Sequence, residues 1–183
     1  GTSEFLGIGA ALSSSTGTST YAGVARNTTG WTPQFGSASE ALSLARMEKA
    51  YLKAREYGRE GDKYLIFANV TLYQKYGDLL VSMRRTVNSV DLTGGWSGID
   101  FQAGAGKVAV FLDYDVPDGE VIVLDMSTWT LCQVDPIDWL ENPEGGALLR
   151  LSNTIKYQAV MVWFANVMCL APAANAKETR KTD

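Results

Sequence analysis

The sequence predicts an α+β fold, because two helical patterns fall in its first half and apolar, strand-like runs fill most of the second half. The chain has 183 residues, of which 46% are hydrophobic and 20% charged. That length suits one sizeable core, and that composition is ordinary for a globular protein. Intrinsic disorder over most of the chain is therefore excluded, and no internal repeat is visible.

Residues 37–58 carry the clearest helical pattern. Ser37 and Glu40 have the S-x-x-E spacing of a capping box, in which hydroxyl and carboxylate satisfy the first free backbone N–H groups. Apolar residues recur three and four apart and predict one buried stripe, made of Ala41, Leu44, Met47, Tyr51 and Ala54. Gly58 is the expected C-cap. Before this helix, residues 1–36 are rich in Gly, Ser and Thr and predict irregular structure.

A short apolar strand is expected at 64–68, followed by a second helix at 71–84 that begins at a Thr71–Gln74 box. Residues 84–98 read as a loop that ends in a glycine-rich stretch. The Pro-Asp-Gly sequence at 117–119 predicts a turn. The remaining expectations are strands at 108–112, 121–124, 129–134 and 157–170, a polar excursion at 135–146, and a frayed tail at 171–183.

Charge and residue types exclude several classes of function. The net charge is −4, so binding of nucleic acid through its phosphate groups is disfavoured. The chain has no histidine, which removes Ser-His-Asp and Cys-His nucleophiles and histidine zinc sites. No other nucleophile has a recognisable base beside it. We therefore expect no enzyme activity, no cofactor and no metal.

The two cysteines, Cys132 and Cys169, are 37 residues apart, and each lies in an apolar run. We expect two buried, reduced thiols in a cytosolic protein, with a disulfide left open. No secretory signal is visible, and the most apolar segment, 157–172, is too short for a membrane helix.

Two features could bind a ligand. Asp113, Asp115, Asp118 and Glu120 surround one turn, which is either a solvated acidic turn or a cation site. Five tryptophans could stack on sugars, although packing is the commoner role; they are Trp31, Trp96, Trp129, Trp139 and Trp163. The sequence GAGK at 104–107 lacks the first glycine and the Ser/Thr of a phosphate loop and is set aside.

Five segments in order resemble the second half of tailed-phage major capsid proteins of the Hong Kong 97-type fold. They are FLGI at 5–8, TYAGVAR at 20–26 with Trp31, the strand and helix at 64–76, the strands at 110–124 followed by Trp129, and the run at 157–172 with Trp163, Asn166, Cys169 and Pro172. Ala22 stands where the family commonly has a second glycine, and Val24-Ala25 replaces Ile-Asp. The N-terminal arm, extended loop and spine helix of the family have no counterpart.

The resemblance implies four parts: residues 1–36 returning from the peripheral domain, an axial domain at 37–150, the closing strand of the peripheral domain at 151–172, and a flexible tail at 173–183. It also implies a head protein of the virion, assembled in the host cytoplasm. Copies of the chain would form pentamers and hexamers of an icosahedral shell around double-stranded DNA, without sequence-specific binding. Scaffold or portal proteins are further candidate partners, and no membrane is involved.

By position, the loop 84–98 and the hairpin 113–120 are the candidates for contacts between subunits, with ordinary exposed loops as the alternative. The contact candidates are Arg84, Arg85, Gly94, Gly95, Trp96, Gly98, Asp115, Asp118 and Gly119. Two other functions remain open: an encapsulin-type nanocompartment shell, and a binding module, for example one that binds carbohydrate.

Overall fold

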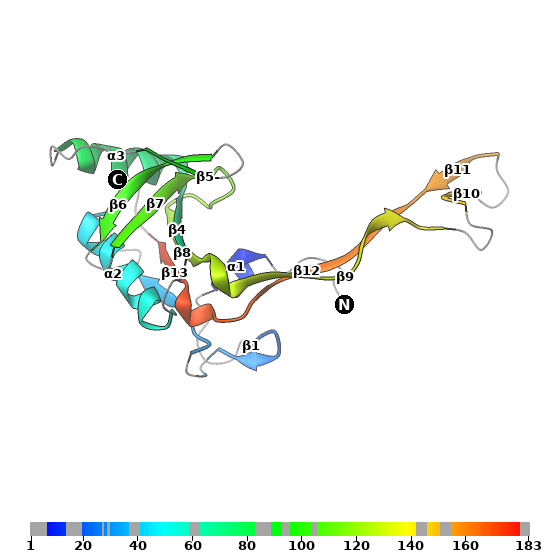
Figure 1. The fold of residues 1–183 in the computed structure, drawn as a ribbon, viewed down its shortest axis with the longest axis horizontal. Helices are drawn as coiled ribbons and strands as arrows, with labels where there is room; N and C mark the ends of the chain where they lie inside the picture. Colours follow the sequence, from blue (N-terminus) through cyan, green and yellow to red (C-terminus); the bar gives the residue numbers. More distant parts are fainter. Residues whose placement is uncertain are drawn as a thin grey trace.

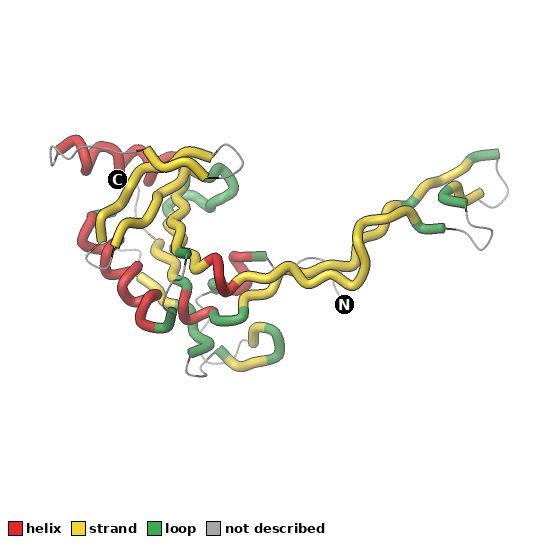
Figure 2. The backbone as a smooth tube through the Cα atoms, viewed as in Figure 1, coloured by secondary structure: helices red, strands yellow, loops and turns green. Residues whose placement is uncertain are grey.

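The computed structural model divides into a body built on a seven-stranded sheet and a long two-stranded arm that leaves it (Figures 1 and 2). The sheet order is β3-β13-β8-β4-β7-β6-β5. The structure describes residues 7–13, 20–26, 28, 30–36, 41–58, 63–82, 89–92, 96–103, 106–141, 146–150 and 155–179. The body is built from residues before 129 and after 169, whereas the arm comes from residues 129–169.

The centre of the sheet is made of apolar strands that are covered on both faces. These strands are β4 (Tyr64–Ala68), β7 (Gly106–Leu112) and β8 (Glu120–Asp125). In β8, Val121 and Val123 face the main core, and Ile122 and Leu124 face the opposite side. The strand expected at 64–68 is confirmed residue for residue.

Two helices, α2 (Leu44–Glu56) and α3 (Val70–Ser82), cover one face of the sheet and share its main core. They contribute Met47, Ala50, Tyr51, Ala54, Leu72, Tyr76 and Leu80. The other face is covered beside β8 by Leu12, which follows the short helix α1 (Ile8–Ala11).

Both helices begin at different residues from those expected. α2 begins at Leu44, with Ser43 at its N-cap, so Ala41 lies outside the helix and is exposed. The proposed box at 37–40 lies outside the described residues. Before α3, Asn69 and not Thr71 is the cap, because its Oδ1 accepts the N–H of Leu72 at 3.0 Å.

Two expectations about the sheet are wrong. The segment expected as a loop at 84–98 includes β5 (Ser89–Leu92) and the start of β6 (Trp96–Ala103), which pair antiparallel. The strands either side of the 113–120 turn do not form a hairpin, because β4 lies between β7 and β8. The turn itself is present, and Gly119 has the positive φ (73°) that its sequence predicts.

The expected flexible tail is also wrong for the residues described. After a short 3₁₀ turn, η2 (Pro172–Ala174), strand β13 (Ala176–Thr179) enters the sheet. It pairs antiparallel with β8 and parallel with β3 (Gln34–Gly36). Lys177 of β13 forms a salt bridge of 2.6 Å with Glu120 of β8, so the charges of this segment are used inside the sheet.

Candidate assembly surface

The arm is a ribbon of two antiparallel strands, β9 (Trp129–Trp139) and β12 (Met161–Cys169). Both are rich in β-branched and aromatic residues, which suit an extended backbone. A smaller pair, β10 (Leu148–Arg150) and β11 (Tyr157–Ala159), lies at the far end (Figure 1). The long strand expected near 157–170 is therefore confirmed as a strand, with a break at Val160.

The apolar side chains of the arm are exposed. Burial on both faces would have explained the charge-free sequence of β12, but in the arm Ile155 is 91% exposed, Val134 82% and Phe164 63%. Other large apolar side chains of the arm are exposed as well: Leu131, Ile137, Trp139, Leu140, Leu148, Tyr157, Met161 and Trp163. Exposed apolar side chains in this number are typical of surfaces that contact another protein, a membrane or a ligand.

The pairing of β9 with β12 separates the arm into two faces. Residues that pair across the two strands lie on the same face of the ribbon, and successive residues of β12 lie on alternate faces. One side, which we call the apolar face, carries Leu131, Gln133, Trp139, Met161, Trp163, Ala165 and Val167. The other, the mixed face, carries Thr130, Cys132, Asp135, Asp138, Val162, Phe164, Asn166 and Met168. Both carboxylates of β9 thus lie on the mixed face, opposite Phe164 and Val162.

β9 continues well beyond the expected end at residue 134, and it is irregular there. Its register with β12 shifts twice. Gln133 and Asp135, two residues apart on β9, pair with residues 165 and 164 of β12, which are adjacent. Asp135 and Asp138, three residues apart, pair with residues 164 and 162, which are two apart. Pro136, which has no N–H for the ladder, lies in the second irregular stretch. The polar excursion expected from residue 135 therefore begins later.

A buried polar network fixes the root of the arm to the body. Asn175 is fully buried, and its Oδ1 accepts the Trp129 indole N–H at 3.0 Å and the Asp125 backbone N–H at 2.9 Å. Its Nδ2 donates to Thr128 Oγ1 at 3.1 Å and to Cys169 Sγ at 3.4 Å. One side chain therefore ties β8 and the first residue of β9 to the last residue of β12.

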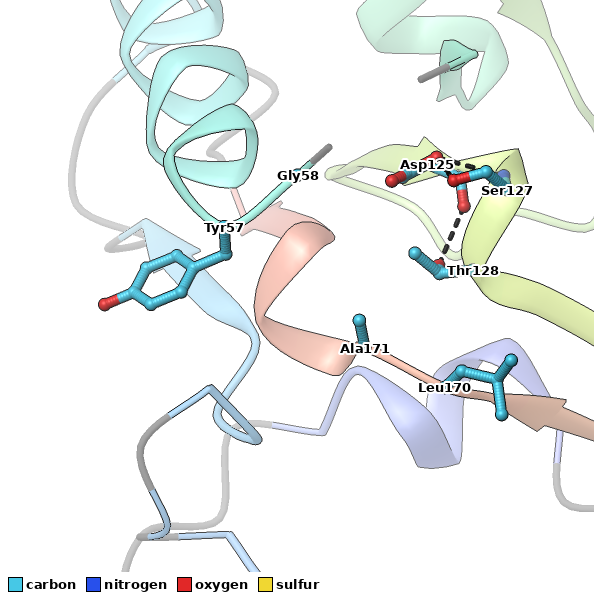
Figure 3. A pocket seen from close by; sticks show the side chains of 7 residues that line it. All are labelled: Tyr57, Gly58, Asp125, Ser127, Thr128, Leu170 and Ala171. Atoms are coloured by element: carbon cyan, nitrogen blue, oxygen red, sulfur yellow. Dashed lines mark hydrogen bonds between the residues drawn. The ribbon is translucent and has the colours of Figure 1, made fainter. Parts of the chain in front are cut away.

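A small pocket of about 140 Å³ lies beside this network (Figure 3). Its lining includes Asp125, Ser127 and Thr128 on one side and Leu170 and Ala171 on the other. The Asp125 carboxylate accepts hydrogen bonds from the backbone N–H and hydroxyl of Ser127, so it already serves as the cap of the 3₁₀ turn η1 (Met126–Thr128). The pocket is explained by the packing of the arm root.

Arg26 holds helix α1 in place beside the root of the arm. Its guanidinium is buried, donates to the carbonyls of Ala10 and Ala11, and stacks 5.5 Å from the centre of the Tyr21 ring. It thereby closes the C-terminal end of α1, where a positive charge is favourable. Burial lowers the pKa of Arg26, but an arginine stays protonated. The Tyr21 hydroxyl in turn accepts the Cys169 N–H at 2.9 Å.

The two cysteines differ in environment. Cys169 is buried at the arm root, and burial raises the pKa of its thiol. Cys132 is exposed on the arm, so the expectation of two buried thiols is wrong for it. Both are free. The apolar run around Cys132 suggested burial, but the arm has no covering element there among the described residues.

The contact candidates of the loop 84–98 receive little support from their positions. Arg84, Arg85, Gly94 and Gly95 lie outside the described residues, and Trp96 and Gly98 belong to β6. Gly98 is buried, and a Cβ added there would lie 2.7 Å from the Val110 carbonyl oxygen. Its lack of a side chain is therefore needed for packing inside the sheet, whatever contacts the neighbouring loop makes.

The acidic turn is held by local contacts. Asp118 accepts hydrogen bonds from the Asn69 amide and, at 3.5 Å, from the Thr71 hydroxyl. The Asp113 carboxylate accepts the Asp115 N–H at 2.9 Å. In the described ranges, no group of three or more His, Cys, Asp or Glu side chains is placed to hold a metal ion. Asp115 and Asp118 are exposed and Gly119 is buried; their role as subunit contacts remains a prediction.

The fold of this chain is similar to that of solved structures of a phage capsid and of an encapsulin. The chain matches the capsid asymmetric unit of cyanophage A-1(L), with 17% identity and a TM-score of 0.63 over 98% of this chain and 60% of that one. It also matches the holo-SrpI encapsulin complex of Synechococcus elongatus PCC 7942, with 12% identity and a TM-score of 0.55 over 80% of this chain and 52% of that one. No protein-family model and no curated protein matches the sequence.

These likenesses confirm the capsid-type fold that the sequence resemblance implied. The chain spans between about half and three-fifths of the length of the structures it matches. Among the described residues, no helix is both long and apolar enough to cross a membrane. The arm is the feature that the sequence did not reveal, because an apolar run predicts a strand without showing what lies against it.

Proposed function

We propose that this chain is a structural subunit of a tailed-phage head, which self-assembles into pentamers and hexamers of an icosahedral shell around double-stranded DNA. The observation that carries the proposal is the exposed apolar arm formed by β9 and β12. An isolated two-stranded ribbon is at best marginally stable in water. It gains stability when a neighbouring subunit covers it, so the arm suits a protein that functions only among copies of itself.

The fold is compatible with this role, and a shell subunit needs no chemical reaction to perform it. The likeness to a cyanophage capsid subunit extends over nearly the whole chain. In this proposal the sheet body is the axial part of the Hong Kong 97-type fold and the arm is the end of its peripheral part. Strands β9 and β10, which the resemblance had placed in the axial stretch 37–150, would then belong to the peripheral part.

The test is the mass of the purified chain in solution against concentration, measured by light scattering on a size-exclusion column and followed by electron microscopy. We expect rings or larger closed assemblies that grow with concentration. A matched variant with Trp139→Glu and Trp163→Glu on the apolar face should remain folded and associate less. A chain that is monomeric at every concentration, or a variant that associates as well as the unaltered chain, would contradict the proposal.

An encapsulin-type shell is the second candidate, favoured by the match to an encapsulin over 80% of the chain. The two candidates differ in contents. Assemblies purified from cells and treated with nuclease should retain protected double-stranded DNA if the subunit belongs to a phage head. Particles that carry protein and no protected DNA would favour the nanocompartment.

A further inference from the structure

An apolar groove of about 550 Å³ lies where the root of the arm meets the body. Four segments line it, and their apolar side chains include Ile8 of α1, Val116 of the acidic turn at 113–120, Ile122 of β8 and Val167 of β12. Ile122 is buried and Val116 and Val167 are half-buried, so these side chains form the floor. The volume is in the range of ligand sites, so the groove can receive several side chains of a partner.

The rim of the groove carries negative charge. Asp113 and Asp115 belong to its lining, and Asp115 is exposed. Glu120 and Lys177 also line the groove, but they form a salt bridge of 2.6 Å with each other, so their charges offset. An apolar floor beneath two carboxylates favours a partner that combines apolar with basic side chains, because complementary charge selects between partners.

The outer face of α2 has this combination of side chains. Leu52 is 43% exposed in the middle of the helix. Lys49 lies three residues before Leu52 and four before Lys53, so it neighbours both on the helix surface, and both lysines are exposed. The helix contains four basic and two acidic residues, a net charge of +2. α2 therefore has the chemistry that the groove favours.

α2 and the groove lie on opposite faces of the sheet. In β8, Val121 and Val123 pack in the core that α2 shares, whereas Ile122 faces the other side and lines the groove. Figure 1 likewise shows α2 and α1 on opposite sides of the sheet. One copy cannot place its own α2 in its own groove, so the contact requires two copies. Each copy contributes a different surface, and such a contact closes a ring when it is repeated by a suitable rotation.

We propose that the groove of one copy receives the outer face of α2 from a second copy, with Leu52 on the apolar floor and Lys49 and Lys53 beside the carboxylates of the rim. Lysine stems cover apolar surface while their ammonium groups stay in water, so no charge has to be buried. The inference rests on the proposed shell function and deepens it, since it assigns a contact between bodies that adds to the contact of the arms. Every copy in a closed ring then uses both surfaces once.

Two glutamate variants test the contact. Leu52→Glu places a carboxylate against the apolar floor and the acidic rim, and Val81→Glu introduces the same charge at an exposed apolar residue of α3. We expect Leu52→Glu to raise the dissociation constant of association at least tenfold, measured by sedimentation, and Val81→Glu to change it less than threefold. Circular dichroism checks that both variants are folded.

A second measurement does not depend on tolerance of the glutamate. In a Cys132→Ser background, chains with Leu52→Cys and chains with Asp115→Cys are prepared separately. A short bismaleimide should link the two when they are mixed and should link neither alone. Val81→Cys is the control in place of Leu52→Cys and should not be linked to Asp115→Cys; Cys169 is buried and serves as an internal check.

The outcomes separate this contact from the shell function. Equal weakening by the two glutamates, linking within either chain alone, equal linking from positions 52 and 81, or no linking in the mixture overturns the contact. The groove then belongs to another partner, while association through the arm and the shell function stand. A purified chain that is monomeric at every concentration overturns both.

Discussion

Ala22 occupies a backbone conformation that suits glycine better. It has φ of 51° and Gly23 has φ of 80° in the two-residue turn between β1 (Thr20–Tyr21) and β2 (Val24–Ala25). Tight hairpin turns of this kind need positive φ at both central residues. The alanine that departs from the capsid family pattern is therefore in a left-handed position, where a Cβ costs about 1 kcal/mol.

We accordingly expect Ala22→Gly to stabilise the body by about 1 kcal/mol. Urea unfolding followed by tryptophan fluorescence measures this change. Gly23→Ala is the matched control, because a Cβ there meets no atom within 4 Å and only backbone strain opposes it; it should destabilise. Two shifts of the same sign would show that the turn has another conformation in solution.

Asn175 has the largest expected effect of any single polar side chain at the arm root. Asn175→Ala leaves the Trp129 indole N–H and the Asp125 backbone N–H without their acceptor. Since each unpaired buried group costs about 1–3 kcal/mol, we expect a loss of about 3 kcal/mol in the free energy of unfolding. The control is Gln133→Ala, which removes an exposed amide side chain from the arm, with an expected change below about 1 kcal/mol; comparable losses in the two variants would argue against the network.

At the scale of elements, β13 shows how a short polar strand completes a sheet. Its sequence, Ala-Lys-Glu-Thr, has little β propensity, yet it joins β3 to β8. Among the described strands, β3 pairs only with β13. Removing β13 would therefore release β3 and turn β8 into an edge.

A chain that ends at Ala171 should consequently lose the cooperative thermal transition of the body, seen by circular dichroism. The control ends at Thr179 and retains all of β13; it should melt as a single transition near the midpoint of the full chain. Cooperative melting of the shorter chain would mean that the remaining strands suffice.

Local patterns predicted some elements and not others, for identifiable reasons. β4 was predicted exactly in extent because five apolar residues lie between polar neighbours. β5 and β13 were missed because short strands with polar residues are stabilised by their partners across the sheet, which local sequence does not specify. The start of α2 was misplaced because the Ser37–Glu40 spacing matches a capping box, whereas the helix begins at Leu44; such local signals are weak and tertiary packing overrides them.

At the scale of the whole molecule, body and arm differ in what stabilises them. The body has a core shared by the sheet and two helices, whereas the arm buries little and depends on its root. The absence of histidine and of a recognisable nucleophile led us to expect no enzyme activity, and order and spacing of motifs predicted the capsid-type fold. The surface was not predictable from the sequence, because an apolar strand has the same sequence whether its own chain or a neighbour covers it.

Replacing residues 131–167 with a short Gly-Ser turn should therefore leave a folded body. The replacement keeps Trp129, Thr130, Met168 and Cys169, so the polar network of the root is intact. We expect the free energy of unfolding to change by less than about 2 kcal/mol, because few buried contacts are lost. Light scattering should show a monomer at concentrations where the full chain associates. An association that survives the replacement would place the main contact on the body.

The position of Asn175 after both strands of the arm also orders events during synthesis. Strand β3 precedes β13 by some 140 residues and cannot pair until β13 has been made, and the arm root cannot close until Asn175 has been made. These long-range contacts slow folding and cannot form until β13 has left the ribosome. A nascent chain thus cannot fix the direction of its arm when the arm strands emerge, and each subunit acquires its adhesive shape only after residues 175–179 have been synthesised.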